Sequence, residues 1–332
     1  MSRQASLSAD SVDRPIELAA PDISRHREGN SGVPYVSTWD SGQPGPHVMV
    51  QALTHGNEIC GAIALDWLLG QGVRPQRGRL TLAFANVEAF SRWDPADPDR
   101  SRYVDEDFNR VWGDDALRGP RDSIELRRAR ELAPVVDRAD YLLDIHSMHE
   151  PCRPIMVCGS AGRGGEKSAA LARAIGVPGD LLIDSGHPAG LRMIERGPFG
   201  DPRDPRTALL IECGQHWERS AADVAIDTML RFLAHTGVVP ADWARTRAPL
   251  EPSPSQQLIR VTEAVVARSM DFRFERAFAG LEVLARAGEP IARDGDTVFR
   301  APYDDTVLVM PSMAHLKPGT TMVRLGRIAA PD

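Results

Sequence analysis

The stretch His47-Val-Met-Val-Gln-Ala-Leu-Thr-His-Gly-Asn-Glu58 decides the fold of this chain. Its first seven residues form a compact apolar run after the Gly- and Pro-rich turn 41–46, a pattern typical of a buried strand. The run ends in a polar turn that carries His55 and Glu58. Apolar residues then recur at helical spacing over 59–69. The stretch therefore predicts a strand, a polar loop and a helix in succession.

The same order of apolar run and polar end recurs along the chain. Short apolar runs end in polar residues at 79–86, 140–147, 153–160 and 207–214, and helical patterns fall at 123–133 and 166–175. This alternation predicts an α/β sheet with many parallel strands. Ligand sites in open α/β sheets lie beyond the carboxyl ends of the strands. We therefore expect His55, His146 and Glu212, which each lie at such an end, to meet at one edge of the sheet.

The composition changes after Phe232. Several prolines between residues 240 and 254 interrupt the chain, and short β-like runs then alternate with turns. We place a boundary near residue 245. The predicted units are an N-terminal tail and lead-in (1–30), a large α/β domain (31–245) and a smaller β-rich C-terminal domain (246–332).

Composition and charge describe an ordinary globular protein. The chain has 332 residues, of which 42% are hydrophobic, enough to bury a substantial core. Acidic residues exceed basic ones, 46 against 39, and the net charge of −7 without a strongly basic segment argues against nucleic acid as a partner. Four separated cysteines without a C-x-x-C pair predict reduced thiols rather than disulfides or a thiolate zinc site.

The sequence gives no sign of a membrane partner. The N-terminal segment 1–14 is polar and lacks the basic start and apolar run of a secretory signal. The longest apolar stretches, such as 307–310, are far shorter than the roughly 20 residues that span a bilayer. We therefore expect a cytoplasmic protein without a membrane anchor.

His55 and Glu58 are candidate metal ligands. A histidine and a glutamate three positions apart on a tight turn can grip one zinc ion and leave positions for a third protein ligand and a water. Such a pair also arises by chance in a chain with 9 histidines and 46 carboxylates. A solvated loop is therefore the alternative at this stage.

Asp144-Ile-His146 supplies the third candidate ligand. Residues two apart in a strand face the same side, so Asp144 and His146 point together toward the predicted site. His146 would bind the metal, and Asp144 would accept the other ring N–H of a metal-bound histidine, which we expect to be His55. A strand-end pair bonded to the backbone is the alternative. His149, in the loop beyond the strand, is the second candidate for the third ligand.

Glu212 is the candidate general base. It ends the otherwise apolar strand 207–212, where a carboxylate must be exposed in a cleft, paired, or held with a raised pKa. As a base it would take a proton from a metal-bound water and return it to a departing amine. A structural salt bridge is the alternative.

The charged segment 102–110 offers candidate substrate ligands. Arginine suits bidentate recognition of carboxylates and stabilisation of an oxyanion. Arg110 with Asn109 could therefore hold a substrate carboxylate while Arg102 polarises the scissile carbonyl. The composition of the segment also fits an exposed loop.

Four motifs together resemble the succinylglutamate desuccinylase and aspartoacylase family, relatives of the zinc carboxypeptidases. They are His55-Gly-Asn-Glu58, Asp107-Phe-Asn-Arg110, Asp144-Ile-His146 and Ile211-Glu-Cys-Gly214, and the resemblance runs from about residue 45 to 235. The resemblance implies one Zn²⁺ per chain bound by His55, Glu58 and His146, catalysis by Glu212 and Arg102, substrate binding by Asn109 and Arg110, and supporting roles for Asp144 and Asp107.

The resemblance also implies a fold and a reaction. The fold would be a carboxypeptidase-like mixed sheet flanked by helices, in a catalytic domain followed by the smaller β-rich domain. The reaction would remove an acetyl, succinyl or similar group from an N-acyl amino acid or related small amide, and a homodimer is a family expectation. Phe108 and Cys213 depart from the family's usual residues, and Tyr303 is the candidate for its acyl-binding tyrosine.

Two other functions stay open. A zinc carboxypeptidase acting on short peptides would use the same metal, base and arginine, but the region after residue 245 resembles the domain that narrows the site in this family. A non-catalytic binding protein of the same fold would not need a carboxylate such as Glu212 at the end of an apolar strand. The sequence therefore favours the deacylase.

Overall fold

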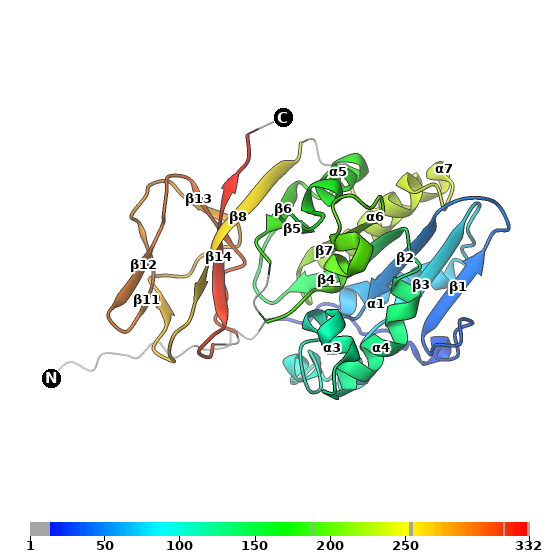
Figure 1. The fold of residues 1–332 in the computed structure, drawn as a ribbon, viewed down its shortest axis with the longest axis horizontal. Helices are drawn as coiled ribbons and strands as arrows, with labels where there is room; N and C mark the ends of the chain where they lie inside the picture. Colours follow the sequence, from blue (N-terminus) through cyan, green and yellow to red (C-terminus); the bar gives the residue numbers. More distant parts are fainter. Residues whose placement is uncertain (1–13, 187–188, 252–254, 315, 331–332) are drawn as a thin grey trace.

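Strand β2 (His47–Ala52) is buried at every position in the interior of a large sheet. It pairs in parallel with β3 (Arg79–Phe84) on one side and with β4 (Tyr141–Met148) on the other. Since β2 has neighbours along both edges and helices over both faces, its apolar side chains have no exposed side. The structure, a computed structural model, describes residues 14–186, 189–251, 255–314 and 316–330 (Figure 1).

Within the described residues, eleven strands form one mixed sheet in the order β1-β3-β2-β4-β7-β5-β6-β8-β14-β13-β10. The strands around β2 and β4 are parallel as far as β7, whereas β5 runs antiparallel to β7. The other strands of this sheet are β1 (Val36–Asp40), β5 (Ile155–Ser160), β6 (Asp180–Asp184), β7 (Thr207–Gln215), β8 (Gln257–Val266), β10 (Glu282–Leu284), β13 (Thr306–Val309) and β14 (Thr321–Ile328). A second sheet contains β9 (Arg273–Phe274), β11 (Pro290–Asp294) and β12 (Thr297–Arg300).

Helices cover both faces of the main sheet. One face carries α1 (Ile59–Gly70), α2 (Val87–Phe90), α5 (Gly165–Ile175), α6 (Arg219–His235) and α7 (Ala241–Arg245), and the other carries α3 (Asp114–Arg118) and α4 (Ile124–Val136). Short 3-10 helices lie at Ser24–His26, Pro98–Ser101, Phe108–Arg110, Met193–Glu195 and Gly197–Gly200. The predicted fold class, a mixed α/β sheet flanked by helices and followed by a β-rich region, is confirmed.

The main sheet continues from the α/β part into the C-terminal part. β8 pairs in parallel with β6 and antiparallel with β14, so these two strands stand between the helices and the C-terminal hairpins (Figure 1). A separate apolar core forms there from residues 265 to 325 alone. A second core joins residues on both sides of residue 245, among them Leu210, Leu281 and Val307, so the division near residue 245 stays a prediction. Residues 1–13 of the proposed tail and lead-in (1–30) lie outside the described residues.

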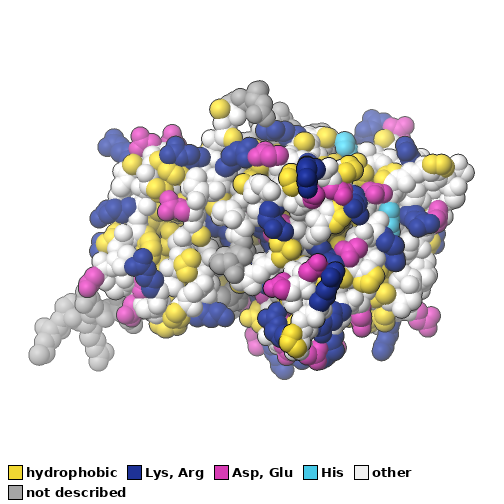
Figure 2. All heavy atoms as spheres, in the orientation of Figure 1, with side chains coloured by type: hydrophobic (Ala, Val, Ile, Leu, Met, Phe, Trp, Pro, Cys, Tyr) yellow, Lys and Arg dark blue, Asp and Glu magenta, His cyan; other side chains and the backbone are white. Residues whose placement is uncertain are grey.

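The surface carries intermixed charges. Lys and Arg side chains alternate with Asp and Glu side chains on the face drawn in Figure 2, and hydrophobic side chains are scattered between them. The positive charges on this face are therefore not gathered into one stripe. Among the described helices, none is both long and apolar enough to cross a bilayer.

Gly61 lets α1 approach the sheet closely, which positions the turn before the helix. A Cβ at this position would lie 2.9 Å from Cβ of Ala52 and 3.0 Å from Cγ2 of Ile145. We predict that Gly61→Val lowers the free energy of unfolding by about 1–3 kcal/mol, because the added methyl groups push α1 away from the sheet. Gly70→Ala in the same helix is the control, since a Cβ there meets nothing within 4 Å. Urea denaturation measures both variants, and equal stabilities would contradict the predicted overpacking.

Candidate metal centre and active site

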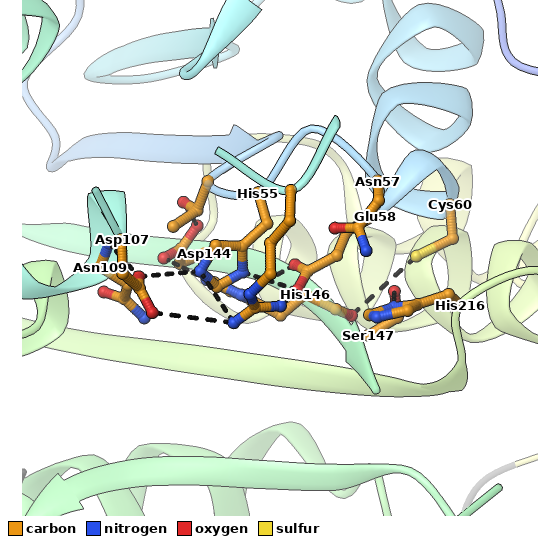
Figure 3. Close-up of polar contacts among 12 residues, drawn as sticks. His55, Asn57, Glu58, Cys60, Asp107, Asn109, Asp144, His146, Ser147 and His216 are labelled. Atoms are coloured by element: carbon orange, nitrogen blue, oxygen red, sulfur yellow. Dashed lines mark hydrogen bonds and ion pairs between the residues drawn. The ribbon is translucent and has the colours of Figure 1, made fainter. Parts of the chain in front are cut away.

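Three neighbouring strands deliver the candidate site residues to one edge of the sheet. The turn after β2 carries His55 and Glu58, and β4 carries His146 (Figure 3). Strand β7 carries Glu212. His146 and Glu212 lie opposite each other in the parallel ladder of β4 and β7. The sheet order therefore brings together residues that the sequence separates, as predicted from the carboxyl ends of the strands.

His55, Glu58 and His146 form a buried cluster. Oε1 of Glu58 lies 2.7 Å from Nδ1 of His55, and Oε2 lies 2.9 Å from Nδ1 of His146. One potential ligand atom from each residue lies within 4.8 Å of the others. Burial alone would raise the pKa of the Glu58 carboxyl, but the two imidazoles hold it well below its usual value.

The cluster fits a zinc ion. Two imidazole nitrogens and one carboxylate are a donor set typical of catalytic zinc sites, which keep a further position open. Oε2 of Glu58 is buried and, apart from Nδ1 of His146 at 2.9 Å, has no polar partner among the described residues, so it has a lone pair available for an ion. The residues present could therefore hold a metal ion.

Each histidine of the cluster is bonded through its second ring nitrogen. Nε2 of His146 lies 2.8 Å from Asp144, and Nε2 of His55 lies 3.0 Å from Asp107. The sequence suggested that Asp144 would support His55, and this pairing is wrong. Asp144 and His146 are two residues apart on one strand face, so their side chains meet directly, whereas His55 faces the loop that carries Asp107. The second oxygen of Asp144 accepts a hydrogen bond of 2.8 Å from Thr54.

Glu212 lies beside the cluster and lines the same cavity. Its Oε2 is buried and has no hydrogen-bond partner among the described residues. Burial raises the pKa of this carboxyl to about 8, although the nearby His146 opposes the shift. A carboxyl with a raised pKa and a free oxygen can exchange a proton with a bound molecule.

The segment 102–110 lies against the cluster. Nη2 of Arg102 is 3.3 Å from Nε2 of His55, so the guanidinium borders the cluster. Arg110 lines the cavity and donates a 2.7 Å hydrogen bond to the carbonyl of Asn109. The side-chain oxygen of Asn109 accepts from the backbone N–H of Met193 at 3.2 Å. The segment is therefore a wall of the site rather than a solvated loop.

Glu125, at the start of α4, holds this segment in place, and no sequence motif pointed to this role. Its carboxylate is fully buried and accepts hydrogen bonds from the backbone N–H groups of Val104, Asp105 and Glu106, at 2.7, 3.0 and 3.3 Å. Asn86 donates a fourth, of 3.0 Å. A carboxylate with four donors rigidly fixes the loop that carries Arg102.

His149 and Tyr303 lie elsewhere than the sequence suggested. His149 lines the cavity, but its ring nitrogens lie 3.1 Å from Asp99 and 3.3 Å from Glu150, outside the metal cluster. The hydroxyl of Tyr303 is 2.6 Å from Oγ1 of Thr262, and its ring is not among the residues that line the cavity. The structure therefore gives no support to the acyl-binding role that the resemblance suggested for Tyr303.

The fold and the site together define an α/β protein with a candidate metal centre at the carboxyl ends of parallel strands. Residues 44–235 match the family model described as the succinylglutamate desuccinylase/aspartoacylase catalytic domain. The chain belongs to this family of acyl-amino acid hydrolases. The resemblance drawn from its motifs is thereby confirmed.

Solved structures show the same fold over most of the chain. Succinylglutamate desuccinylase from Vibrio cholerae has a TM-score of 0.62 and 17% identity, covering 86% of this chain and 82% of that one. A succinylglutamate desuccinylase/aspartoacylase from Rhodobacter sphaeroides has a TM-score of 0.63 and 19% identity, covering 89% of each chain. The ectoine utilization protein EutE from Ruegeria pomeroyi has a TM-score of 0.60 and 15% identity, covering 90% of this chain and 92% of that one. No curated protein gives a significant match to the sequence.

Replacing Glu125 by glutamine tests its hold on the loop. The amide keeps one acceptor oxygen but turns an NH₂ group toward backbone N–H donors. We predict that Glu125→Gln lowers the free energy of unfolding by about 1–3 kcal/mol and reduces hydrolysis of acyl-amino acids, because Arg102 loses its position. Glu131 is an exposed residue on the same helix, so Glu131→Gln should change the free energy of unfolding and the rate of hydrolysis only slightly. An unchanged unfolding free energy in Glu125→Gln would contradict the clamp.

The ion pairs of His149 should make stability depend on pH. Hydrogen bonds to Asp99 and Glu150 raise its pKa from 6.5 to about 9. The protonated His149 contributes its full stabilisation of the fold below pH 6.5, the pKa in the unfolded chain. This contribution is lost as the pH rises toward about 9, the pKa in the folded protein. We predict that the stability difference between the wild type and His149→Asn, measured by denaturation, shrinks between pH 6.5 and 9. The exposed His235→Asn is the control, and a pH-independent difference for His149 would contradict the ion pairing.

Proposed function

We propose that the chain is a zinc-dependent amidohydrolase that removes an acyl group, such as acetyl or succinyl, from an N-acyl amino acid or related small amide. The observation that carries the proposal is the buried cluster of His55, Glu58 and His146 with the free carboxylate oxygen of Glu212 beside it. Buried charges of this kind cost folding free energy unless an ion compensates them. Membership of a family of acyl-amino acid hydrolases supports the same reaction.

One zinc ion per chain would be held by the two histidines and Glu58. When bound, it supplies a Lewis acid that activates water and polarises a carbonyl. Asp144 and Asp107 would accept the second ring N–H of His146 and His55. With the metal bound, these bonds would fix the planes of both rings and leave the nitrogens that face Glu58 to bind the ion.

Glu212 would act first as general base and then as general acid. Its Oε2 is committed to no described residue, so it can accept a proton from the attacking water. The protonated carboxyl would then pass this proton to the nitrogen of the departing amine. The same carboxylate would thus serve both halves of the hydrolysis.

The arginines of the segment 102–110 would bind the substrate. Arg102 borders the metal cluster, where its guanidinium would stabilise the negative charge that develops on the carbonyl oxygen. Arg110 lines the cavity and would hold the α-carboxylate of the amino acid. Asn109 uses its oxygen to bind the backbone of Met193, which leaves its amide nitrogen for the substrate.

A zinc carboxypeptidase acting on short peptides is the second candidate, since it would use the same residues. The cavity encloses about 210 Å³, and residues of the C-terminal part, among them Gly280, Met310 and Pro311, line it. A site walled by a second part of the chain favours small amides over peptides. The non-catalytic alternative is disfavoured by the free carboxylate oxygen of Glu212.

Metal content and an amine-release screen test the proposal together. We predict one zinc per chain by mass spectrometry of untagged protein, and release of free amine from N-acetyl or N-succinyl amino acids that stops on chelation and returns with added zinc. Glu212→Gln should keep its zinc but lower kcat by about 10²–10⁴-fold, the effect of losing a general base.

Each arm of this experiment has an outcome that contradicts the proposal. Protein without metal that gains no activity on addition of zinc would exclude the zinc mechanism. Normal turnover by Glu212→Gln would remove this residue from the reaction. Release of C-terminal residues from peptides, with N-acyl amino acids untouched, would identify the carboxypeptidase instead.

A further inference from the structure

The cavity extends across the sheet, away from the candidate metal centre. Its lining passes from Glu212 and Leu210 on β7 to Val157 on β5 and to Leu182 and Asp184 on β6. Residues two apart on each strand face the same side, so the floor is apolar between Glu212 and Asp184. A bound molecule can therefore reach from the reacting centre to a second polar region.

Arginine side chains line that second polar region. One of them, Arg192, is already hydrogen-bonded to neighbouring side chains. Its guanidinium lies 2.9 Å from Asp184, 3.0 Å from Glu195 and 3.3 Å from the hydroxyl of Ser160. With these bonds made, Arg192 has little capacity left for a ligand. It acts as a partner that holds Asp184 and Glu195 in place.

Arg324 on β14 lines the same region but is not engaged in this way. Its side chain is 15% exposed, and it forms no hydrogen bond to any residue that the structure describes. Its nearest carboxylate oxygen belongs to Asp184, 3.4 Å from Nε, and that carboxylate already accepts from Arg192. Apart from this ion pair, the five N–H donors of the guanidinium have no acceptor among the described residues, so Arg324 can donate hydrogen bonds to an anion in the cavity.

The backbone fixes Arg324 in this position. It pairs with Ala264 of β8 and with Val309 of β13, so β14 is held on both edges. Burial lowers the pKa of Arg324, and the charge of Arg192 lowers it further while Asp184 opposes. Asp184 and Glu195 bond Arg192, so the N–H groups of Arg324 are the ones left in this region to bind an anion.

We propose that Arg324 is a specificity-determining residue that binds a substrate carboxylate remote from the scissile amide. The preferred substrate then carries this carboxylate in addition to the one assigned to Arg110. The inference rests on the proposed deacylase function, and it gives the C-terminal part of the chain a direct contact with substrate. Arginine suits this task because its planar fork binds a carboxylate through two parallel hydrogen bonds.

Matched substrates that differ only in the remote carboxylate test the inference. N-succinyl and N-butyryl derivatives of one amino acid differ on the acyl side, and N-acetylglutamate and N-acetylnorvaline differ on the amine side. We expect the wild type to prefer the charged member of one pair, and that pair identifies which side faces Arg324. Arg324→Met should lower kcat/KM for the charged member about 10- to 100-fold and leave the uncharged member unchanged, with Arg324→Lys between them.

Arg327→Met is the matched control. Arg327 lies on the same strand, is exposed, and stacks over the ring of Tyr303, 3.5 Å from its centroid. The variant Arg327→Met should leave kcat/KM unchanged for both members of each substrate pair. If Arg324→Met lowered kcat/KM equally for the charged and the uncharged substrate, the inference would be overturned, because Arg324 would then have a purely structural role. If Arg324→Met fails to fold, Arg324→Lys and Arg324→Gln allow the same comparison of kcat/KM between the charged and the uncharged substrate.

Calorimetric binding of glutarate and butyrate to the zinc-loaded protein separates this inference from the proposed function. Glutarate should bind the wild type more tightly than butyrate, and Arg324→Met should remove that preference. This result would support the anion subsite even if no N-acyl amino acid were hydrolysed. Equal binding of glutarate to the wild type and Arg324→Met would overturn the inference even in an active deacylase.

Discussion

The burial of Glu58 between two imidazoles is the constraint on which the rest of the site depends. The Glu58 side chain is 2% exposed, and each of its carboxylate oxygens lies within 3 Å of a histidine ring nitrogen. A charge buried this deeply must be compensated on every side. His55 and His146 provide the first compensation, and Asp107 and Asp144 bond the far sides of the two rings. Glu58, the two histidines and the two aspartates therefore form one polar network, which borders the cavity.

Two of those walls come from segments far from the cluster in sequence. The loop 102–110 stands beside the cluster because the buried carboxylate of Glu125 holds three of its backbone N–H groups. The C-terminal strands stand on the opposite side because β8 and β14 extend the same hydrogen-bonded sheet past β6. Arg324 reaches the cavity from there. The site is thus a property of the whole sheet, and both parts of the chain are needed to enclose it.

Local sequence patterns predicted the strands and helices better than they predicted which side chains contact each other. The apolar runs around β2, β4 and β7 were recognised, and the polar residues at their ends do lie together (Figure 3). The partner of Asp144 was misassigned because a strand pattern shows which residues share a face but not which loop covers it. Tyr303, the candidate acyl-binding tyrosine, has its hydroxyl bonded to Thr262 and does not line the cavity. The ligand, base and substrate roles themselves stay predictions that the proposed experiments test.

Hydrophobic periodicity and chain breaks are local properties, so they were enough to predict the α/β fold, the strands and helices of the first part, and the polar residues at the strand ends. The sequence motifs also determined the family. Only the tertiary structure decided that Glu125 anchors the loop of Arg102, and that Arg324 faces the cavity from a different part of the chain. These contacts join residues distant in sequence, and the order and register of strands, which no local pattern encodes, set the distances between them.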